Sequence, residues 1–115
     1  MPPTTPPPPS AQGSIRVGIE DGGLVLHLTG EVDTATVAEF EATEVAGGDS
    51  SQARLLLVID ASAVTFMNSV GVGFLLRQTE ATRNAGLRPL LRRPSRAALH
   101  VLQLTGIDKL FDRID

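Results

Sequence analysis

The stretch from Leu55 to Leu76 constrains the fold more than any other part of the chain. It opens with an uninterrupted apolar run, Leu55–Ile59, which has the length of one strand. A run that is apolar at successive positions is typical of a central strand covered on both faces. Residues 60–68 are more polar and are predicted to form a loop at the carboxyl end of that strand, where functional loops gather in α/β sheets.

An amphipathic helix is predicted to follow this loop, from about Ser69 to Asn84. Ser69 stands where the loop becomes the helix. The backbone N–H groups at that end have no partner within the helix, and the helix dipole makes the end positive. The hydroxyl of Ser69 is therefore expected to cap the helix, and a phosphate on the same hydroxyl would also be favourably placed. Position alone favours the capping role.

The residues before this stretch predict a hairpin and a helix. Alternating or apolar strands at Ile15–Ile19 and Leu24–Thr29 are joined by a strong turn signal at residues 21–23, which predicts an antiparallel hairpin. Asp33 is a suitable cap for a helix from about Thr34 to Ala46.

The residues after it predict a further strand and helix. Pro89 lacks an N–H donor, so it favours an edge position, or an N–H side facing solvent, for the strand Leu87–Arg92. A third helix is predicted from Ser95 to about Thr105, and Leu110–Ile114 is predicted to close the chain as a short strand or turn. Together the elements predict a single α/β domain, with helices packed on a mixed, mostly parallel sheet of four or five strands.

Composition sets the outer limits. The 115 residues suit one domain, and six of the eight prolines fall in residues 1–13, which are predicted to be a disordered tail. Residues 14–115 remain as the folded domain. The absence of cysteine, the formal charge of −3 and the lack of a long apolar run argue against a disulfide framework, a polyanion-binding protein and a membrane-spanning protein. We therefore expect a cytoplasmic protein with no direct contact to nucleic acid or membrane.

No catalytic constellation stands out. Ser69 is not in a Gly-x-Ser-x-Gly elbow, and no sequence argument brings His27 or His100 near it. His27 is expected to lie on the opposite face of its strand from its apolar neighbours. Glu31 and Asp33 could be interpreted as a catalytic carboxylate pair, but capping and solvation explain them better.

Cofactor and metal motifs are also missing. Gly71 and Gly73 lack the third glycine or the Gly-Lys-Ser/Thr of a nucleotide-binding loop, and no His/Cys/Asp cluster has metal-ligand spacing. We expect no cofactor, no metal and no enzymatic activity, and favour a binding module switched by covalent charge. The chain also carries a run of arginines, interpreted as a solvated face or as a patch for an acidic partner: Arg88, Arg92, Arg93 and Arg96.

Several segments together resemble the STAS domain of bacterial anti-sigma factor antagonists. The resemblance covers the chain from about Ile15 to the C-terminus. The most specific segment is Phe66-Met67-Asn68-Ser69-Val70-Gly71-Val72-Gly73, which follows an apolar strand that ends in Asp. It is supported by Gly30-Glu31-Val32-Asp33, Val58-Ile59-Asp60, Leu104-Thr105-Gly106-Ile107 and Leu110-Phe111.

The resemblance implies a partner-switching function. In this family the unphosphorylated domain binds an anti-sigma factor, usually a serine kinase with a histidine-kinase-like ATPase fold, and the sigma factor is released. The kinase phosphorylates the serine at the position of Ser69, which ends binding, and a phosphatase restores the serine. The implied partner-binding residues are Glu31, Asp33, Met67, Asn68, Ser69, Val70, Gly71 and Val72.

One position departs from the family pattern. The family usually has Asp before the phosphorylated serine, whereas this chain has Asn68, which keeps an acceptor oxygen but loses the charge. This difference favours an alternative function, an unphosphorylated STAS interaction module in a transporter or a stressosome-like assembly.

Overall fold

The computed structural model describes residues 12–47 and 55–115. The predicted tail therefore lies almost entirely outside the described residues. The elements follow one another as β1 (Gly13–Glu20), β2 (Gly23–Val32), α1 (Thr34–Gly47), β3 (Leu56–Met67), α2 (Ser69–Asn84), β4 (Leu90–Arg92), α3 (Arg96–Thr105), the short 3-10 helix η1 (Ile107–Leu110) and β5 (Asp112–Ile114).

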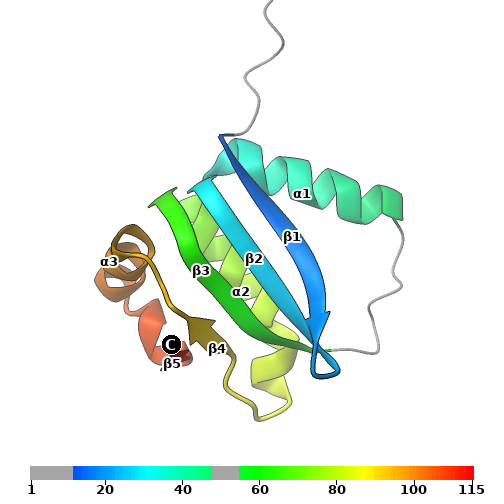
Figure 1. The fold of residues 1–115 in the computed structure, drawn as a ribbon, viewed down its shortest axis with the longest axis vertical. Coiled ribbons are helices and arrows are strands. Elements are labelled where there is room, and N and C mark those ends of the chain that lie inside the picture. The colour runs from blue at the N-terminus through cyan, green and yellow to red at the C-terminus, as the bar shows by residue number, and fades with distance from the viewer. Residues whose placement is uncertain (1–11, 48–54) are drawn as a thin grey trace, which may run out of the picture.

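The strands form one five-stranded sheet in the order β1-β2-β3-β4-β5 (Figure 1). β1 and β2 are antiparallel, and the other three neighbouring pairs are parallel. This confirms the predicted mixed, mostly parallel sheet. β4 lies between β3 and β5, so the edge position expected for it is wrong; Pro89 precedes the strand, and its carbonyl accepts from the N–H of Asp112 at 3.1 Å.

The predicted hairpin is present, and its turn consists of two of the three residues expected. Glu20 pairs with Gly23, and the two residues between them have positive φ angles, 52° for Asp21 and 81° for Gly22. Two consecutive left-handed residues define a type I′ turn, whose twist matches that of the flanking strands. The Asp-Gly sequence tolerates this conformation, which explains why the turn was readable from the sequence.

The loop predicted for residues 60–68 is wrong for most of its length. β3 continues to Met67 and pairs with β2 as far as Val32. The pairing has register shifts, so burial in this half of β3 recurs every third residue, at Ala61, Val64 and Met67. Bulges of this kind break the period of two by which a strand is recognised.

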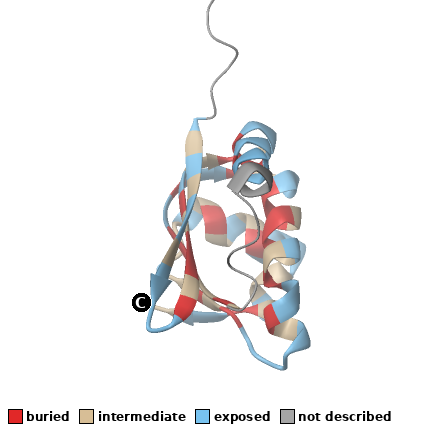
Figure 2. Ribbon diagram, turned by 90° about the vertical axis from the view of Figure 1, so that its right-hand side faces the viewer, coloured by how far each residue is buried: buried red, intermediate tan, exposed pale blue. Residues whose placement is uncertain are grey.

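All three α-helices contribute to one hydrophobic core on one side of the sheet (Figure 2). Within this core the rings of Phe40 on α1 and Phe74 on α2 meet edge to face, with their centroids 5.4 Å apart. The opposite face of the sheet carries no helix within the described ranges, so the prediction that β3 is covered on both faces is wrong. Val58 of β3 is only half-buried because it lies on that open face.

Candidate functional site

Two helices begin at the same edge of the sheet. The register pairs Glu31 with Phe66 and Val32 with Met67 at the carboxyl ends of β2 and β3. One residue beyond each strand stands the cap of a helix, Asp33 for α1 and Asn68 for α2. The N–H of Asn68 also donates to the carbonyl of Val32 at 3.4 Å, which ties the two strand ends together. The positive ends of two helix dipoles therefore lie side by side.

Asn68, not Ser69, caps α2. Its side-chain Oδ1 accepts from the N–H of Val70 at 3.0 Å and of Gly71 at 3.2 Å, and its carbonyl accepts from the N–H of Val72 at 3.1 Å. Ser69 is the first residue of the helix, so the expected capping role of its hydroxyl is wrong. An amide oxygen caps as well as a hydroxyl does, and the prediction placed the cap one residue too late.

Asp33 caps α1 as predicted. Its Oδ1 accepts from the N–H of Thr36 at 3.1 Å, and the buried hydroxyl of Thr36 donates to the carbonyl of Glu31 at 2.7 Å. The carboxylate of Asp33 is thus engaged with the helix end. This bond supports the capping interpretation over a catalytic carboxylate pair with Glu31.

Gly71 lets the first turn of α2 approach the end of β2. A Cβ atom at this position would lie 2.7 Å from the carbonyl oxygen of Val32 and 2.9 Å from Cγ of Met67. No side chain fits at such distances, so glycine is needed here. Gly73 differs, because the nearest atom to its ideal Cβ is Nη1 of Arg77 at 3.6 Å.

The predicted partner-binding residues converge at this edge but divide into two layers. Met67, Gly71 and Val72 are buried beneath it. Ser69 and Val70 are exposed, and so is Phe66, with 47% of its surface accessible. We call the outer layer the Ser69 surface: Glu31, Asp33, Phe66, Asn68, Ser69 and Val70.

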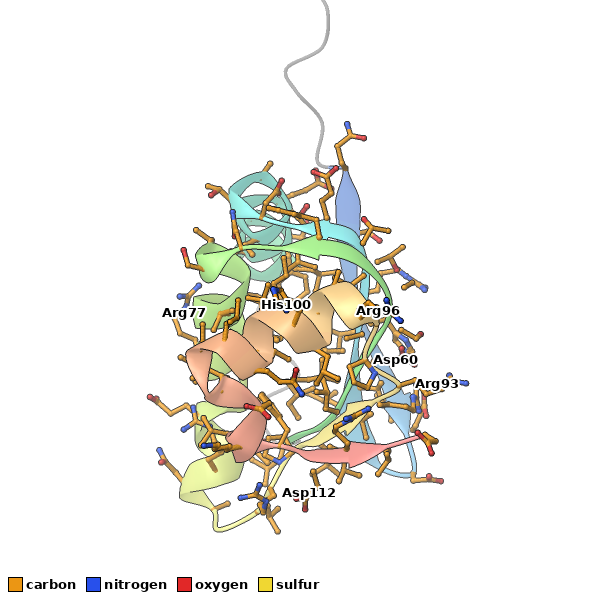
Figure 3. All side chains as sticks on the ribbon, turned by 90° about the vertical axis from the view of Figure 1, so that its left-hand side faces the viewer. Asp60, Arg77, Arg93, Arg96, His100 and Asp112 are labelled. Carbon is orange, nitrogen blue, oxygen red and sulfur yellow. The ribbon has the colours of Figure 1, made fainter. Side chains whose placement is uncertain are left out.

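A second polar cluster, which the sequence did not predict, lies on the open face of the sheet. Asp60 of β3 accepts from Ser62 and from Nε of Arg92, and Nη2 of Arg93 lies 3.5 Å away (Figure 3). Arg92 also bonds Glu20 of β1 at 3.0 Å, so their side chains meet over β2 and β3.

The contacts within this cluster favour the charged forms of Asp60 and Arg92. Burial opposes the ionisation of Asp60, but the hydrogen bonds from Ser62 and Arg92 outweigh it and lower its pKa from 3.8 to about 2. Glu20, and then Asp60, raise the pKa of Arg92. A general base needs a pKa near the working pH, so Asp60 is unsuited to that role. Its pairing indicates a structural role.

The arginine run does not form one surface. Arg92 is largely buried in this cluster, and Arg88 donates to Asp112 and to two backbone carbonyls. Arg93 and Arg96 are exposed. The position predicted for His27 is confirmed, because its side chain faces Glu20 on the open side of the sheet. His100 is exposed on α3.

The described residues lack two features. No three His, Asp or Glu side chains in ranges 12–47 and 55–115 are grouped so that they could hold a metal ion. No helix in those ranges is both long and apolar enough to cross a membrane.

The fold and the Ser69 surface define a class of protein: a small α/β domain that presents a mixed polar and apolar surface at the carboxyl ends of two parallel strands. More specifically, the chain belongs to the STAS domain family, whose model matches residues 14–115. The resemblance noted in the sequence is thereby confirmed.

Named relatives agree with this assignment. The chain is 36% identical over 104 residues to the anti-sigma-F factor antagonist RsfB of Mycobacterium tuberculosis, with 89% of this chain and 83% of that protein covered. A crystal structure of an anti-sigma factor antagonist from Mycobacterium paratuberculosis is 30% identical, with a TM-score of 0.64 over 90% of this chain and 88% of that one.

A more distant structure shares the fold. The anti-sigma factor antagonist SpoIIAA in its unphosphorylated form is 21% identical, with a TM-score of 0.65 and 88% of each chain covered. This likeness confirms the predicted α/β fold class.

Proposed function

We propose that this chain is an anti-sigma factor antagonist whose Ser69 surface binds an anti-sigma factor and whose binding ends when Ser69 is phosphorylated. The relatives named as anti-sigma factor antagonists support the first part. The observation that carries the second is the position of Ser69, exposed at the first residue of α2 while Asn68 holds the cap. Its hydroxyl makes no hydrogen bond within the described part of the chain, so it is accessible to a kinase.

The chemistry of the surface suits a switch by charge. Phe66 and Val70 offer apolar contact area, and Glu31 and Asp33 supply carboxylates around it. A phosphate adds a charge of about −1.5 to −2 and three strongly hydrated oxygens. Burying it against an apolar or acidic partner surface is costly, whereas the two helix ends stabilise it in the free protein. Binding is therefore lost without a change of fold.

The roles of the remaining residues follow from their burial. Asn68 contributes an edge of the contact surface, while Met67, Gly71 and Val72 fix the position of α2 beneath it. The partner is an anti-sigma factor with serine kinase activity, a phosphatase reverses the modification, and the cycle takes place in the cytoplasm. The protein itself acts by binding and not by catalysis.

A pull-down from the source cell tests the proposal. Full-length wild-type, Ser69→Ala and Ser69→Asp baits are compared, with Gln103→Glu on α3 as a control that adds a charge at another exposed position. We expect the wild-type, Ser69→Ala and Gln103→Glu baits to capture an anti-sigma factor and Ser69→Asp to lose it. Addition of ATP to the wild-type complex should place a phosphate on Ser69, detected by mass spectrometry.

The alternative is an interaction module that is never phosphorylated. Asn68 favours it, because it lacks the charge that usually precedes the modified serine in this family. Equal capture by wild-type and Ser69→Asp baits, with no phosphate on Ser69, would replace the proposed switch with this alternative. Capture of transporter or stressosome-like components would identify its setting.

A further inference from the structure

Among the described strands, β1 lies at one edge of the sheet and pairs with β2 alone (Figure 1). It pairs with β2 over its whole length without a register shift, and it contains neither proline nor lysine. Proteins usually protect a long edge with such devices, because its free N–H and C=O groups can pair with another strand. β1 also exposes two β-branched side chains, Val17 at 44% and Ile19 at 58%.

The outward-facing backbone groups can be assigned. In an antiparallel ladder, hydrogen-bonded pairs alternate with non-bonded ones, and the pair that closes a two-residue hairpin is hydrogen-bonded. Glu20–Gly23 is that pair, and the bond from Glu31 N–H to the carbonyl of Gln12, eight residues before Glu20, follows the same alternation. The even-numbered residues of β1 therefore face β2. The backbone groups of Ile15, Val17 and Ile19 point away from the sheet.

The side chains of β1 complement a second copy of the same strand. Arg16 and Glu20 lie on the open face of the sheet with Gly18 between them, since their register partners are His27, Gly23 and Val25. When two β1 strands pair antiparallel about Gly18, Arg16 stands opposite Glu20 of the second copy, twice. The same register pairs Val17 with Ile19 of the second copy, so outward-facing backbone groups meet each other.

Two observations favour this register over others. No ion pair within the described part of the chain includes Arg16, whereas Glu20 is bound to Arg92 through a carboxylate with capacity for a second guanidinium. A register shifted to centre on Val17 would place Arg16 opposite Gly18 and Glu20 opposite Ser14, and would pair no charges. The register centred on Gly18 sets opposite charges against each other and also brings the outward-facing backbone groups of the two strands together.

From these features we infer that β1 is the interface of a two-fold symmetric dimer of this chain, in which the two sheets join into one. The interface lies along the sheet edge, and its Glu20 end is at the opposite end of the sheet from Ser69 (Figure 1). β2 separates β1 from β3, the strand that precedes Ser69, so dimerisation leaves Ser69 itself free, and the inference does not depend on the proposed function.

Cysteine crosslinking tests the register, because the chain has no cysteine of its own. Gly18→Cys places two thiols directly opposite each other at the spacing of a non-hydrogen-bonded pair, which a disulfide can span. The new Cβ would lie 3.6 Å from Nε2 of His27, an ordinary contact. We expect a disulfide-linked dimer on mild oxidation of full-length Gly18→Cys. Ser14→Cys, on the same face of the same strand, should stay monomeric on a denaturing gel.

Sedimentation of the wild-type chain and of an Arg16→Glu variant tests the association itself. Wild-type protein should form a dimer in a concentration-dependent way. Arg16→Glu sets like charges opposite each other at two places and should raise the dissociation constant of the dimer on the order of tenfold. A wild-type monomer at several hundred micromolar, an unchanged constant for Arg16→Glu, or equal crosslinking of the Ser14→Cys and Gly18→Cys variants would each overturn the inference.

Discussion

Arg92 Nε donates to Asp60 Oδ2 at 2.9 Å, although the two residues are 32 positions apart. They are register partners on β3 and β4, so their side chains leave the same face of the sheet. Both are largely shielded from solvent, with side-chain exposures of 19% for Arg92 and 10% for Asp60. An ion pair in this setting is costly to break, because either charge alone would remain partly buried.

Stability should fall in acid because of Asp60. Its pKa is lowered from 3.8 to about 2 in the folded protein, so its contribution is fully present above pH 3.8 and is lost as the pH falls through about 2. The difference between the two values corresponds to about 2 kcal/mol. Urea unfolding of wild-type and Asp60→Asn between pH 2 and 7 measures it. The gap between the two proteins should narrow by about that amount towards pH 2; a constant gap would contradict the assignment.

Removal of Arg92 should destabilise the protein more than removal of an exposed arginine. Arg92→Met leaves Asp60 with Ser62 and the exposed Arg93, and should cost about 1–3 kcal/mol of unfolding free energy. Arg77→Met is the matched control, because the pair of Arg77 with Glu41 is exposed at 58% and 47% and should contribute under about 1 kcal/mol. Chemical denaturation compares them, and equal losses would show that the cluster contributes no more than a surface pair.

The two glycines of α2 should respond to alanine with opposite signs. Gly71→Ala places a methyl group 2.7 Å from the carbonyl oxygen of Val32, a backbone atom that cannot easily move, and should cost about 1–3 kcal/mol. Gly73→Ala meets only Arg77 at 3.6 Å and should stabilise the helix by up to about 1 kcal/mol. Thermal unfolding separates the two. Equal destabilisation by both variants would argue against the close approach at Gly71.

The cap of α2 should depend on Asn68 and not on Ser69. Asn68→Ala removes the acceptor of two N–H groups and should cost about 1 kcal/mol. Asn68→Asp keeps the acceptor and adds a negative charge at the helix N-terminus, worth about 0.3–1 kcal/mol of stabilisation. Ser69→Ala should change stability by less than about 0.5 kcal/mol. A loss for Ser69→Ala as large as that for Asn68→Ala would reassign the cap.

Local signals in the sequence were sufficient for the hairpin, the cap of α1, the start of α3 at Ser95 and the order of the elements. The turn at Asp21 and Gly22, the cap at Asp33 and the cap at Ser95, whose Oγ accepts from the N–H of Ala98 at 3.1 Å, each depend on residues a few positions apart. The left-handed Gly106 that ends α3 is of the same kind. Such features are set by local backbone chemistry.

The sequence failed where the deciding contact is distant. The second half of β3 pairs with β2 through register shifts, so its buried positions recur every third residue and its sequence lacks the alternation by which a strand is recognised. The cluster of Glu20, Asp60 and Arg92 joins residues up to 72 positions apart, which no local pattern can report. At the Ser69 surface, the motif included Phe66 and Met67, but only the structure shows that Phe66 faces outward and Met67 inward.

Asn68 caps α2 while the hydroxyl of Ser69 stays free within the described residues, and this has a consequence for the protein in the cell. Because the amide of Asn68 holds the start of α2, chemistry at the hydroxyl of Ser69 disturbs no hydrogen bond of the described fold. Phosphorylated molecules should then resist unfolding, and hence proteolysis, at least as well as unmodified ones, because the two helix ends stabilise the phosphate. The ratio of the two forms would be set by the enzymes that add and remove the phosphate, and not by faster loss of the modified form.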